Sequence, residues 1–531
     1  MSVALRPDVA GLFLETARRL GDKTALVRRG EATSFAELAR DVEQLASGLR
    51  RAGLQPGERV ALLVPPSRDL YSATFALFHA GLVPVLIDPG IGFRNMGRCL
   101  AESEPVAFIG SPKAHLARLL GRWAPTSRLN IVADGAVPGM SRLSDYHSDE
   151  PLTGGVEDSA AAAILFTSGS TGAPKGAIYT HGVFSAQVEL LRSMFDIREG
   201  EVSVPTFPLF GLFDAALGQT CVIPEMDFTR PGGVDPMAVV RPIQEHGAHQ
   251  LFGSPALLDR LGRFGEKHGI ALPTLRRVMS AGAPVPAKVL ERFTKMLPPG
   301  VQIFTPYGAT EALPVSLIGS EEVLGETSAL TAQGRGVCVG RPVAGAEVAV
   351  IRISDAPLGA WDESLRVRSG EVGEIVVKGP MVSRDYLRRP DAAALAKIRD
   401  GSQVRHRMGD LGRIDEKGRL WFCGRKAQRV LTPDGELYTI PVEGVFNTHP
   451  AVKRTALVSV GEKPVLCVER ESAAEISDAS LTKELLSIGA RHPHTKGVAT
   501  ILYHPSFPVD IRHNAKIDRE LLAVWAAGRL S

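Results

Sequence analysis

The stretch that most constrains the fold of this chain is a glycine- and hydroxyl-rich loop that directly follows a buried strand pattern. Residues 160–166 form an unbroken small and apolar run, and the polar loop FTSGSTGAPKG at 166–176 ends it abruptly. Glycine lets a backbone turn its N–H groups towards an anion, and Gly169, Gly172 and Gly176 stand where this is needed. Further donors are the hydroxyl groups of Thr167, Ser168, Ser170 and Thr171 and the ammonium group of Lys175. The loop therefore predicts a polyphosphate site at a strand end.

Two other glycine loops that bind phosphate do not fit this stretch. A Walker-type loop has Gly-Lys followed by Ser or Thr, whereas Pro174 precedes Lys175 and Gly176 follows it. The dinucleotide fingerprint needs a Gly-x-Gly-x-x-Gly spacing, which the loop lacks. The remaining interpretations are a different class of nucleotide loop or a plain Ser/Gly turn.

Length, charge and cysteine content narrow the class of protein. A chain of 531 residues, 44% of them hydrophobic, exceeds a single core, so we expect at least two domains. The formal charge of +3, from 61 basic and 58 acidic residues, does not favour nucleic acid as a partner. The five cysteines are scattered and form no Cys-x-x-Cys pair, which argues against a disulfide framework and against a zinc site. Reduced thiols of this kind predict a cytoplasmic protein.

The chain shows no pattern of a secretory signal or a membrane anchor. Charged Arg6, Asp8 and Glu15 interrupt the first residues, so no apolar signal core is expected there. The most apolar long segment, 71–87, contains His79, Gly81 and Pro84 and reads as a core helix that leads into a strand. We therefore expect no transmembrane helix.

Strand and helix patterns alternate along the first part of the chain. Ser34 and Glu37 form a capping box that opens a helix with apolar residues at helical spacing. Strand-like runs follow at 60–64, 83–87, 106–109 and 129–132, with helical patterns such as 69–80 between them. This alternation predicts an α/β fold of mostly parallel sheets covered by helices, with ligands at the carboxyl ends of strands.

A polar joint divides this region from a smaller C-terminal one. Residues 424–429, GRKAQR, separate two ordered patterns, and strands at 456–460 and 465–468 and a helix at 481–488 follow. We therefore predict a large domain over 1–424, a hinge over 425–429 and a small α+β domain over 430–531.

Two further stretches hold candidate substrate and metal residues. The aromatic run FPLFGLF at 207–213 fits either an ordinary core or a hydrocarbon pocket, and its candidates are Phe207, Phe210, Gly211 and Phe213. The motif YGATE at 307–311 follows an apolar run at 301–304, which places it at another expected strand exit. Glu311 offers the hard oxygen that Mg²⁺ prefers, and Thr310 offers a phosphate donor.

Taken together, these motifs resemble the adenylate-forming superfamily of acyl-CoA synthetases, luciferases and peptide adenylation domains. The loop at 166–176 resembles its ATP loop, and YGATE resembles its second signature. The resemblance implies ATP with Mg²⁺, an adenine site at Gly282, Ala283, Pro284, Tyr307 and Gly308, and ribose contacts from Asp410 and Arg425. Lys516, in HNAKIDR, is similar to the adenylation lysine that stabilises charge on the attacking carboxylate and the α-phosphate.

Other stretches are similar to one branch of that superfamily, the bacterial β-lactone synthetases of long-chain olefin biosynthesis. They are residues 86–92, 108–115 and 207–214. Three departures from the ligase pattern accompany them: Ala427 in the hinge, Gly435 one position late, and Gly211 where many acyl-CoA synthetases have histidine. This resemblance implies a long-chain 2-alkyl-3-hydroxy fatty acid as substrate and a β-lactone, AMP and pyrophosphate as products. It also makes other enzymes of the olefin pathway possible partners.

Two alternative functions share the same nucleotide motifs. A long-chain acyl-CoA or acyl-carrier ligase would differ only in its second substrate. A non-catalytic adenylate-binding protein would keep the fold, although the presence of Lys516, Glu311 and Asp410 argues against it.

Overall fold

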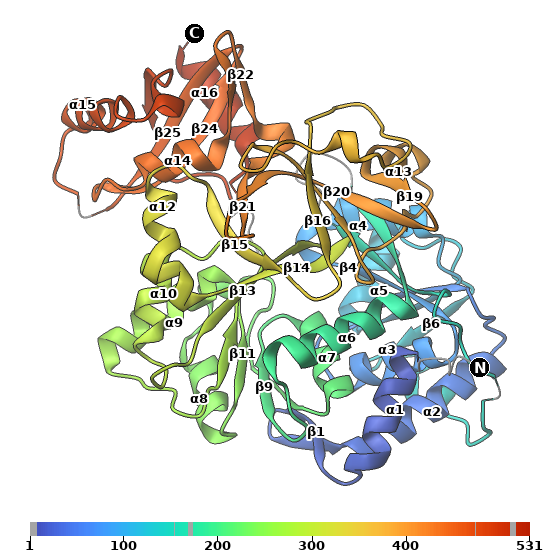
Figure 1. Ribbon diagram of the computed structural model, residues 1–531. Helices are drawn as coiled ribbons and strands as arrows, with labels where there is room; N and C mark the ends of the chain where they lie inside the picture. Colours follow the sequence, from blue (N-terminus) through green and yellow to red (C-terminus); the bar gives the residue numbers. More distant parts are fainter. Residues whose placement is uncertain (1–7, 153, 168–173, 473, 510–516, 531) are drawn as a thin grey trace.

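A computed structural model describes residues 8–152, 154–167, 174–472, 474–509 and 517–530 (Figure 1). Two sheets carry the large N-terminal region, and a three-stranded sheet forms the centre of the C-terminal region. None of the described helices is long and apolar enough to cross a bilayer.

The first sheet is mostly parallel and carries the strand that leads into the phosphate loop. Its order is β18-β8-β7-β4-β3-β5-β6, in which only β8 and β18 run antiparallel to their neighbours. The strands are β3 (Arg59–Leu63), β4 (Val83–Ile87), β5 (Ala107–Gly110), β6 (Leu129–Val132), β7 (Ala161–Thr167), β8 (Lys175–Thr180) and β18 (Asp385–Tyr386). The strand pattern at 160–166 is therefore confirmed as β7.

The second sheet has a parallel half and an antiparallel half. The parallel half, with an antiparallel edge strand β2 (Glu31–Ser34), contains β1 (Thr24–Arg28), β9 (Val202–Pro205), β10 (Thr220–Ile223), β11 (Gln250–Phe252), β12 (Arg277–Met279) and β13 (Ile303–Ala309). The antiparallel half contains β14 (Ala312–Gly319), β15 (Val337–Pro342), β16 (Glu347–Ile351), β17 (Gly373–Lys378), β19 (Lys397–Asp400), β20 (Gln403–Ile414) and β21 (Leu420–Arg425). The expectation of mostly parallel strands thus holds for the first sheet and for the parallel half of the second sheet. The antiparallel half of the second sheet departs from it.

Helices cover both sheets, and their apolar faces form the main cores. The helices of the large region are α1 (Val9–Leu20), α2 (Phe35–Arg51), α3 (Arg68–His79), α4 (Phe93–Ser103), α5 (Pro112–Gly121), α6 (His181–Phe195), α7 (Pro208–Leu217), α8 (Met237–Glu245), α9 (Pro255–His268), α10 (Ala287–Thr294), α11 (Ser320–Glu322), α12 (Ser328–Ala332) and α13 (Pro390–Ala396). The largest core joins residues of α1, α2, α3, α6 and α7 to both sheets. The predicted capping box is confirmed: Ser34 and Glu37 cap α2 reciprocally.

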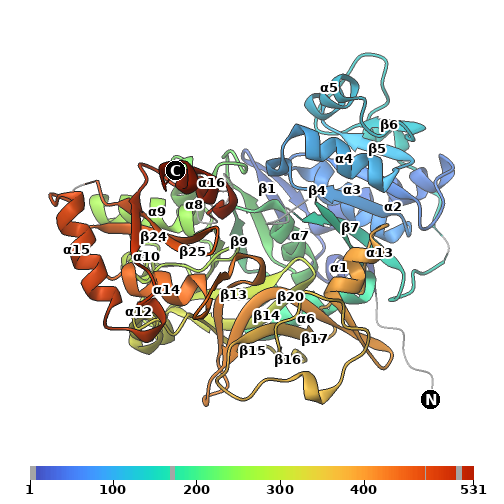
Figure 2. The same ribbon diagram turned by 90° about the horizontal axis from the view of Figure 1, so that it is seen from above.

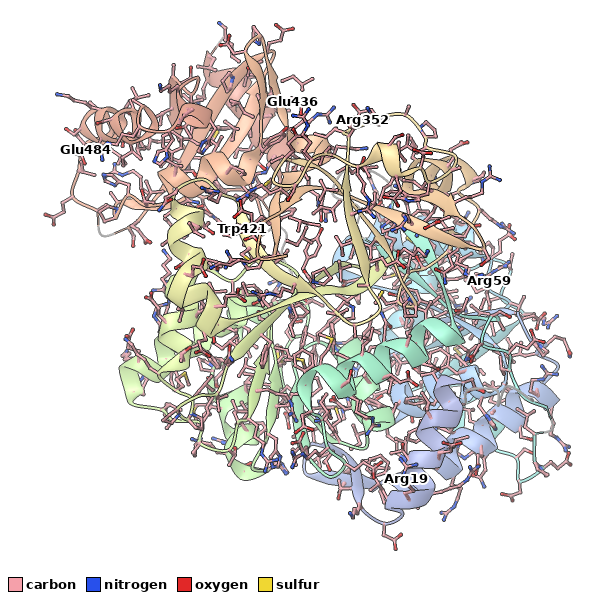
Figure 3. All side chains as sticks on the ribbon, in the orientation of Figure 1. Arg19, Arg59, Arg352, Trp421, Glu436 and Glu484 are labelled. Atoms are coloured by element: carbon pink, nitrogen blue, oxygen red, sulfur yellow. The ribbon has the colours of Figure 1, made fainter. Side chains whose placement is uncertain are left out.

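The C-terminal region contains the elements that its sequence pattern predicts. They are β22 (Val430–Thr432), β23 (Gly435–Leu437), α14 (Thr439–Phe446), β24 (Val452–Val460), β25 (Lys463–Arg470), α15 (Asp478–Gly489), β26 (Thr500–Tyr503) and α16 (Arg519–Leu530). Their side chains form separate cores. Figure 3 shows Trp421 where this region meets the large sheet, and Glu436 and Glu484 within the region itself.

Ion pairs hold the segment predicted as the hinge against the large sheet. Lys426 Nζ lies 3.2 Å from Glu374 Oε1, and Arg429 Nη2 lies 2.7 Å from Asp355 Oδ2. Glu374 is buried and also pairs with Arg407 at 2.7 Å. The division into domains at 425–429 remains a prediction.

Candidate active site

One cleft of about 3040 Å³ brings together most of the predicted site residues. The predicted residues that line it are Lys175, Phe207, Phe210, Phe213, Gly282, Ala283, Pro284, Tyr307, Gly308, Thr310, Glu311, Asp410 and Arg425. They come from both sheets and from α7, which explains why they are far apart in the sequence. The carboxyl-end rule for α/β sheets predicts such a meeting point.

Part of the predicted phosphate site and the predicted catalytic lysine fall outside the described residues. These are Ser168, Gly169, Ser170, Thr171, Gly172 and Lys516. Of the neighbouring residues, Thr167 ends β7 opposite Lys175, which begins β8. Val509 and Ile517 pair through an antiparallel bridge and both line the cleft. Roles for the residues between them therefore remain predictions.

An acidic side chain with two partners occupies the predicted ribose corner. Tyr307 donates its hydroxyl hydrogen to Asp410 Oδ2 at 2.7 Å, and Arg425 Nη1 lies 2.8 Å from Asp410 Oδ1. Burial, together with the Asp410 charge, raises the pKa of Tyr307, so this phenol stays protonated. The Asp410 charge also raises the pKa of Arg425. A carboxylate is an acceptor of the kind that two vicinal ribose hydroxyl groups need, and ribose binding by Asp410 remains a prediction.

Strand register places these groups beside one another. Asp410 lies opposite Arg425 in the antiparallel ladder of β20 and β21, so their side chains share one face. Gly308 is needed where β13 turns into β14, because a Cβ there would lie 2.5 Å from the carbonyl oxygen of Ala312. The prediction that YGATE follows a strand was wrong in one respect: Tyr307, Gly308 and Ala309 belong to β13, and only Thr310 and Glu311 form the turn.

The predicted metal corner contains one carboxylate held by a tyrosine. Tyr386 donates its hydroxyl hydrogen to Glu311 Oε1 at 2.7 Å, and Lys175 Nζ lies 5.6 Å from the centre of the Tyr386 ring. Within the described ranges, no group of three or more His, Cys, Asp or Glu residues could hold a metal ion. Glu311 offers a carboxylate oxygen of the kind that Mg²⁺ binds together with phosphate oxygens, and its role as a metal ligand remains a prediction.

Three residues near Glu311 were not predicted as site residues, because they belong to none of the sequence motifs. Tyr386, Lys397 and His406 line or border the cleft next to Glu311. Burial lowers the pKa of Lys397 to about 8, while the nearby Glu311 and Asp385 charges oppose this shift. Burial and the Lys397 charge lower the pKa of His406 far below its usual value, so this imidazole is neutral. His406 precedes Asp410 by four residues on β20. Because residues separated by an even number along a strand lie on the same face, this spacing could have indicated that His406 lies on the side of the predicted ribose residue.

Aromatic side chains of α7 and β11 form an apolar wall of the cleft. The rings of Phe210 and Phe252 stack with their centres 3.9 Å apart, and Phe207 lies 5.6 Å from Phe210. Phe213 and Phe184 continue the wall, with ring centres 6.2 Å apart. Phe207, Phe210 and Phe213 thus line the cleft and also pack against the main core, and a hydrocarbon pocket at 207–213 remains a prediction.

Gly211 differs from this prediction because it faces away from the cleft. It is buried, and a Cβ at this position would lie 2.2 Å from the Tyr71 hydroxyl oxygen and 3.2 Å from Cys221 Sγ. Helical geometry explains the difference, since residues 210 and 213 share one face of α7 while 211 lies on another. A histidine would not fit there without displacing Tyr71.

Changing Glu311 to glutamine should raise the Mg²⁺ concentration needed for half-maximal activity by about tenfold, because the neutral amide is a weaker ligand for a hard cation. Glutamine keeps an acceptor for the Tyr386 hydroxyl, so the local structure should remain. The measurement is a Mg²⁺ titration of pyrophosphate release at fixed ATP. Glu321→Gln is the matched control, because Glu321 is an exposed residue of α11 that does not line the cleft. An unchanged Mg²⁺ requirement in Glu311→Gln would remove this residue from the metal site.

Comparison with known proteins shows which family this chain belongs to. An olefin beta-lactone synthetase of Xanthomonas campestris pv. campestris is 49% identical over 509 residues, which cover 93% of this chain and 91% of the relative. An olefin beta-lactone synthetase of Stenotrophomonas maltophilia is 48% identical over 549 residues, which cover 98% of each chain. An amide bond synthetase structure from Marinactinospora thermotolerans matches 98% of this chain and 99% of its own, with a TM-score of 0.81 and 24% identity. The family model described as AMP-binding enzyme matches residues 13–387. This chain belongs to the AMP-binding enzyme family.

Proposed function

We propose that this protein uses ATP to convert a long-chain 2-alkyl-3-hydroxy fatty acid into a β-lactone, with release of AMP and pyrophosphate. The observation that carries the proposal is the 49% and 48% identity, over more than nine-tenths of the chain, to two olefin beta-lactone synthetases. The cleft adds a compatible geometry, because nucleotide-type polar groups and an aromatic wall meet in it.

The first step is adenylation of the acid. A carboxylate oxygen of the substrate attacks the α-phosphorus of ATP, the bond from that phosphorus to the oxygen of the β-phosphate breaks, and pyrophosphate departs to leave an acyl adenylate. Asp410 and Arg425 would orient the ribose, and Lys175 and Thr310 would contact the phosphates. Glu311 would hold the Mg²⁺ that neutralises phosphate charge. Lys516 would stabilise the negative charge that develops at the α-phosphate.

The second step closes the ring. The 3-hydroxyl oxygen of the same substrate attacks the acyl carbon, the bond from that carbon to the AMP oxygen breaks, AMP departs, and the hydroxyl proton is released to solvent. Because nucleophile and electrophile belong to one bound molecule, the reaction gains greatly in effective concentration, which helps to offset the ring strain. The wall of Phe207, Phe210 and Phe252 would hold the alkyl chain and keep water from the adenylate.

The product identifies the second step. Purified enzyme with ATP, Mg²⁺ and a long-chain 2-alkyl-3-hydroxy acid should yield a β-lactone with and without coenzyme A, because the attacking oxygen belongs to the substrate. Mass spectrometry of the extracted product, together with assays of AMP and pyrophosphate, measures this.

A matched acid that lacks the 3-hydroxyl group serves as the control. It should be adenylated but should give no lactone, so that the adenylate accumulates on the enzyme. A thioester formed readily from the hydroxy acid and coenzyme A, with only a stalled adenylate in its absence, would instead establish an acyl-CoA ligase. Absence of pyrophosphate release with every acid would point to a nucleotide-binding protein without catalysis.

A further inference from the structure

Helix α5 presents apolar side chains to solvent. Leu116, Leu119 and Leu120 are 59%, 63% and 75% exposed, and Phe93, at the start of α4, is 53% exposed. The three leucines have i, i+3 and i+4 spacing, so they lie on one face of the helix. Large leucines this exposed are unusual when they gather in one place, since scattered ones need no explanation.

The four side chains form one patch, which we call the α4–α5 patch. Phe93 lies against the C-terminal end of α5: a Cβ added at Gly121 would come within 2.8 Å of Phe93 Cζ. The Phe93 ring also packs on Trp123, with ring centres 4.4 Å apart. The patch is therefore continuous from Phe93 to the leucines of α5.

The opposite face of α5 attaches the helix to the first sheet. His115 is buried, with Nε2 at 2.9 Å from the Ile131 carbonyl oxygen, and Arg118 lies over the Phe108 ring with Cζ 5.6 Å from its centre. Figure 2 shows α5 at the outer end of the lobe that also contains α4, β5 and β6. The leucines thus lie on the solvent-exposed side of a helix that His115 and Arg118 attach to the first sheet.

Exposed cationic side chains lie on the same two helices as the α4–α5 patch or directly after them. Arg94, Arg98, Lys113 and Arg122 are exposed, and within the part of the chain that the structure describes none of them forms an ion pair. The acidic side chains of this region are neutralised: Glu102 pairs with Arg389 at 2.6 Å, and Glu104 pairs with Arg388. A small apolar surface with exposed cations on the same helices is complementary to anionic lipid headgroups above acyl chains.

The α4–α5 patch adjoins the substrate cleft. Phe93, Lys113 and Trp123 line the same cleft as the aromatic wall of α7. An apolar molecule that left a bilayer at this patch would meet the cleft without crossing open water. This continuity distinguishes the patch from the other exposed apolar residues, such as Leu486 and Val524 in the C-terminal region.

We propose that the α4–α5 patch docks this protein on the surface of an anionic lipid bilayer, with Leu116, Leu119, Leu120 and Phe93 inserted among the acyl chains. The cations hold the headgroups and the cleft faces the membrane. In this proposal the protein lies on the membrane surface and does not span the bilayer. The inference goes beyond the proposed function, because lipid binding needs neither ATP nor acid.

Vesicle co-sedimentation of the full-length protein tests the docking without nucleotide or acid. Vesicles of equal parts phosphatidylcholine and phosphatidylglycerol should bind the protein, phosphatidylcholine alone should bind it weakly, and salt should weaken the binding. The double variant Leu119→Ser, Leu120→Ser should lower the partition coefficient by about tenfold or more. Arg94→Glu with Arg98→Glu should remove the preference for anionic lipid. The matched control, Leu486→Ser with Val524→Ser, should bind like the parent, with circular dichroism confirming that each variant is folded.

Several outcomes would overturn this inference. Equal vesicle binding by the α5 variant and its control would show that the α4–α5 patch does not dock. Self-association in the absence of vesicles, abolished by the α5 variant, would assign the patch to a second copy of the chain. Lactone formation is measured separately, with acid dispersed in detergent, so failure of docking leaves the proposed function intact. Conversely, if the parent protein formed no lactone, the proposed function would be wrong, and the vesicle experiment would still decide whether the α4–α5 patch binds lipid.

Discussion

Changing Lys516 to alanine should slow adenylate formation by about a hundredfold or more, while ATP still binds. A cation that meets the α-phosphate acts on charge that develops in the transition state, and the loss of one such donor typically costs that much in rate. The residues proposed to bind the ribose, the adenine and the metal ion line the cleft, so we expect ATP to bind without Lys516. The measurement is ATP–pyrophosphate exchange with the acid present, together with ATP affinity by calorimetry.

Lys483→Ala provides the matched control for this variant. Lys483 is an exposed lysine on α15 of the same C-terminal region and does not line the cleft. Exchange should therefore be normal in the control. Near-normal exchange in Lys516→Ala would withdraw the catalytic role from this lysine and leave the adenylation cation unassigned.

Replacement of Asp410 by alanine should weaken ATP binding by about a hundredfold or more. Two ribose hydroxyls would lose a charged acceptor, and each hydrogen bond to a charged group is worth about 1.5–3 kcal/mol. The variant also removes the common partner of Tyr307 and Arg425, so both groups would lose their alignment with the nucleotide. Calorimetric titration of ATP into the variant measures the change. Asp410→Asn keeps an acceptor but not the charge, so its ATP affinity should lie between that of the parent protein and that of Asp410→Ala.

Asp415→Ala separates loss of stability from loss of binding. Asp415 lies between β20 and β21, outside the cleft, and accepts from Trp421 Nε1 and Arg419 Nε, each at 2.8 Å. This control should lower the thermal midpoint while the ATP affinity stays near that of the parent. Equal ATP affinities for Asp410→Ala and the parent protein would place the ribose elsewhere.

Local pattern was sufficient for the parts of the site that depend on contiguous residues. The apolar run before the phosphate loop predicts β7, and the motif YGATE predicts a carboxylate beside the nucleotide, because short stretches determine both strand exits and side-chain chemistry. The same holds for the α/β class, since alternating helix and strand patterns lead to helix-covered parallel strands. Asp410 and Arg425 were predicted from motif resemblance, and strand register then explains why they are adjacent.

Long-range packing decided the rest. Tyr386 reaches Glu311 only because the short strand β18 pairs with β8 at the edge of the first sheet, while Glu311 lies in the turn between β13 and β14 of the second sheet. Gly211 turns from the cleft because α7 packs that face on Tyr71. The spacing of Leu116, Leu119 and Leu120 is the same in a buried helix and in an exposed one. Sequence by itself thus determined the fold class, the nucleotide chemistry and the residue types of the site. Only the tertiary structure decided which distant side chains meet and which apolar face stays in solvent, because these depend on contacts between elements far apart in the chain.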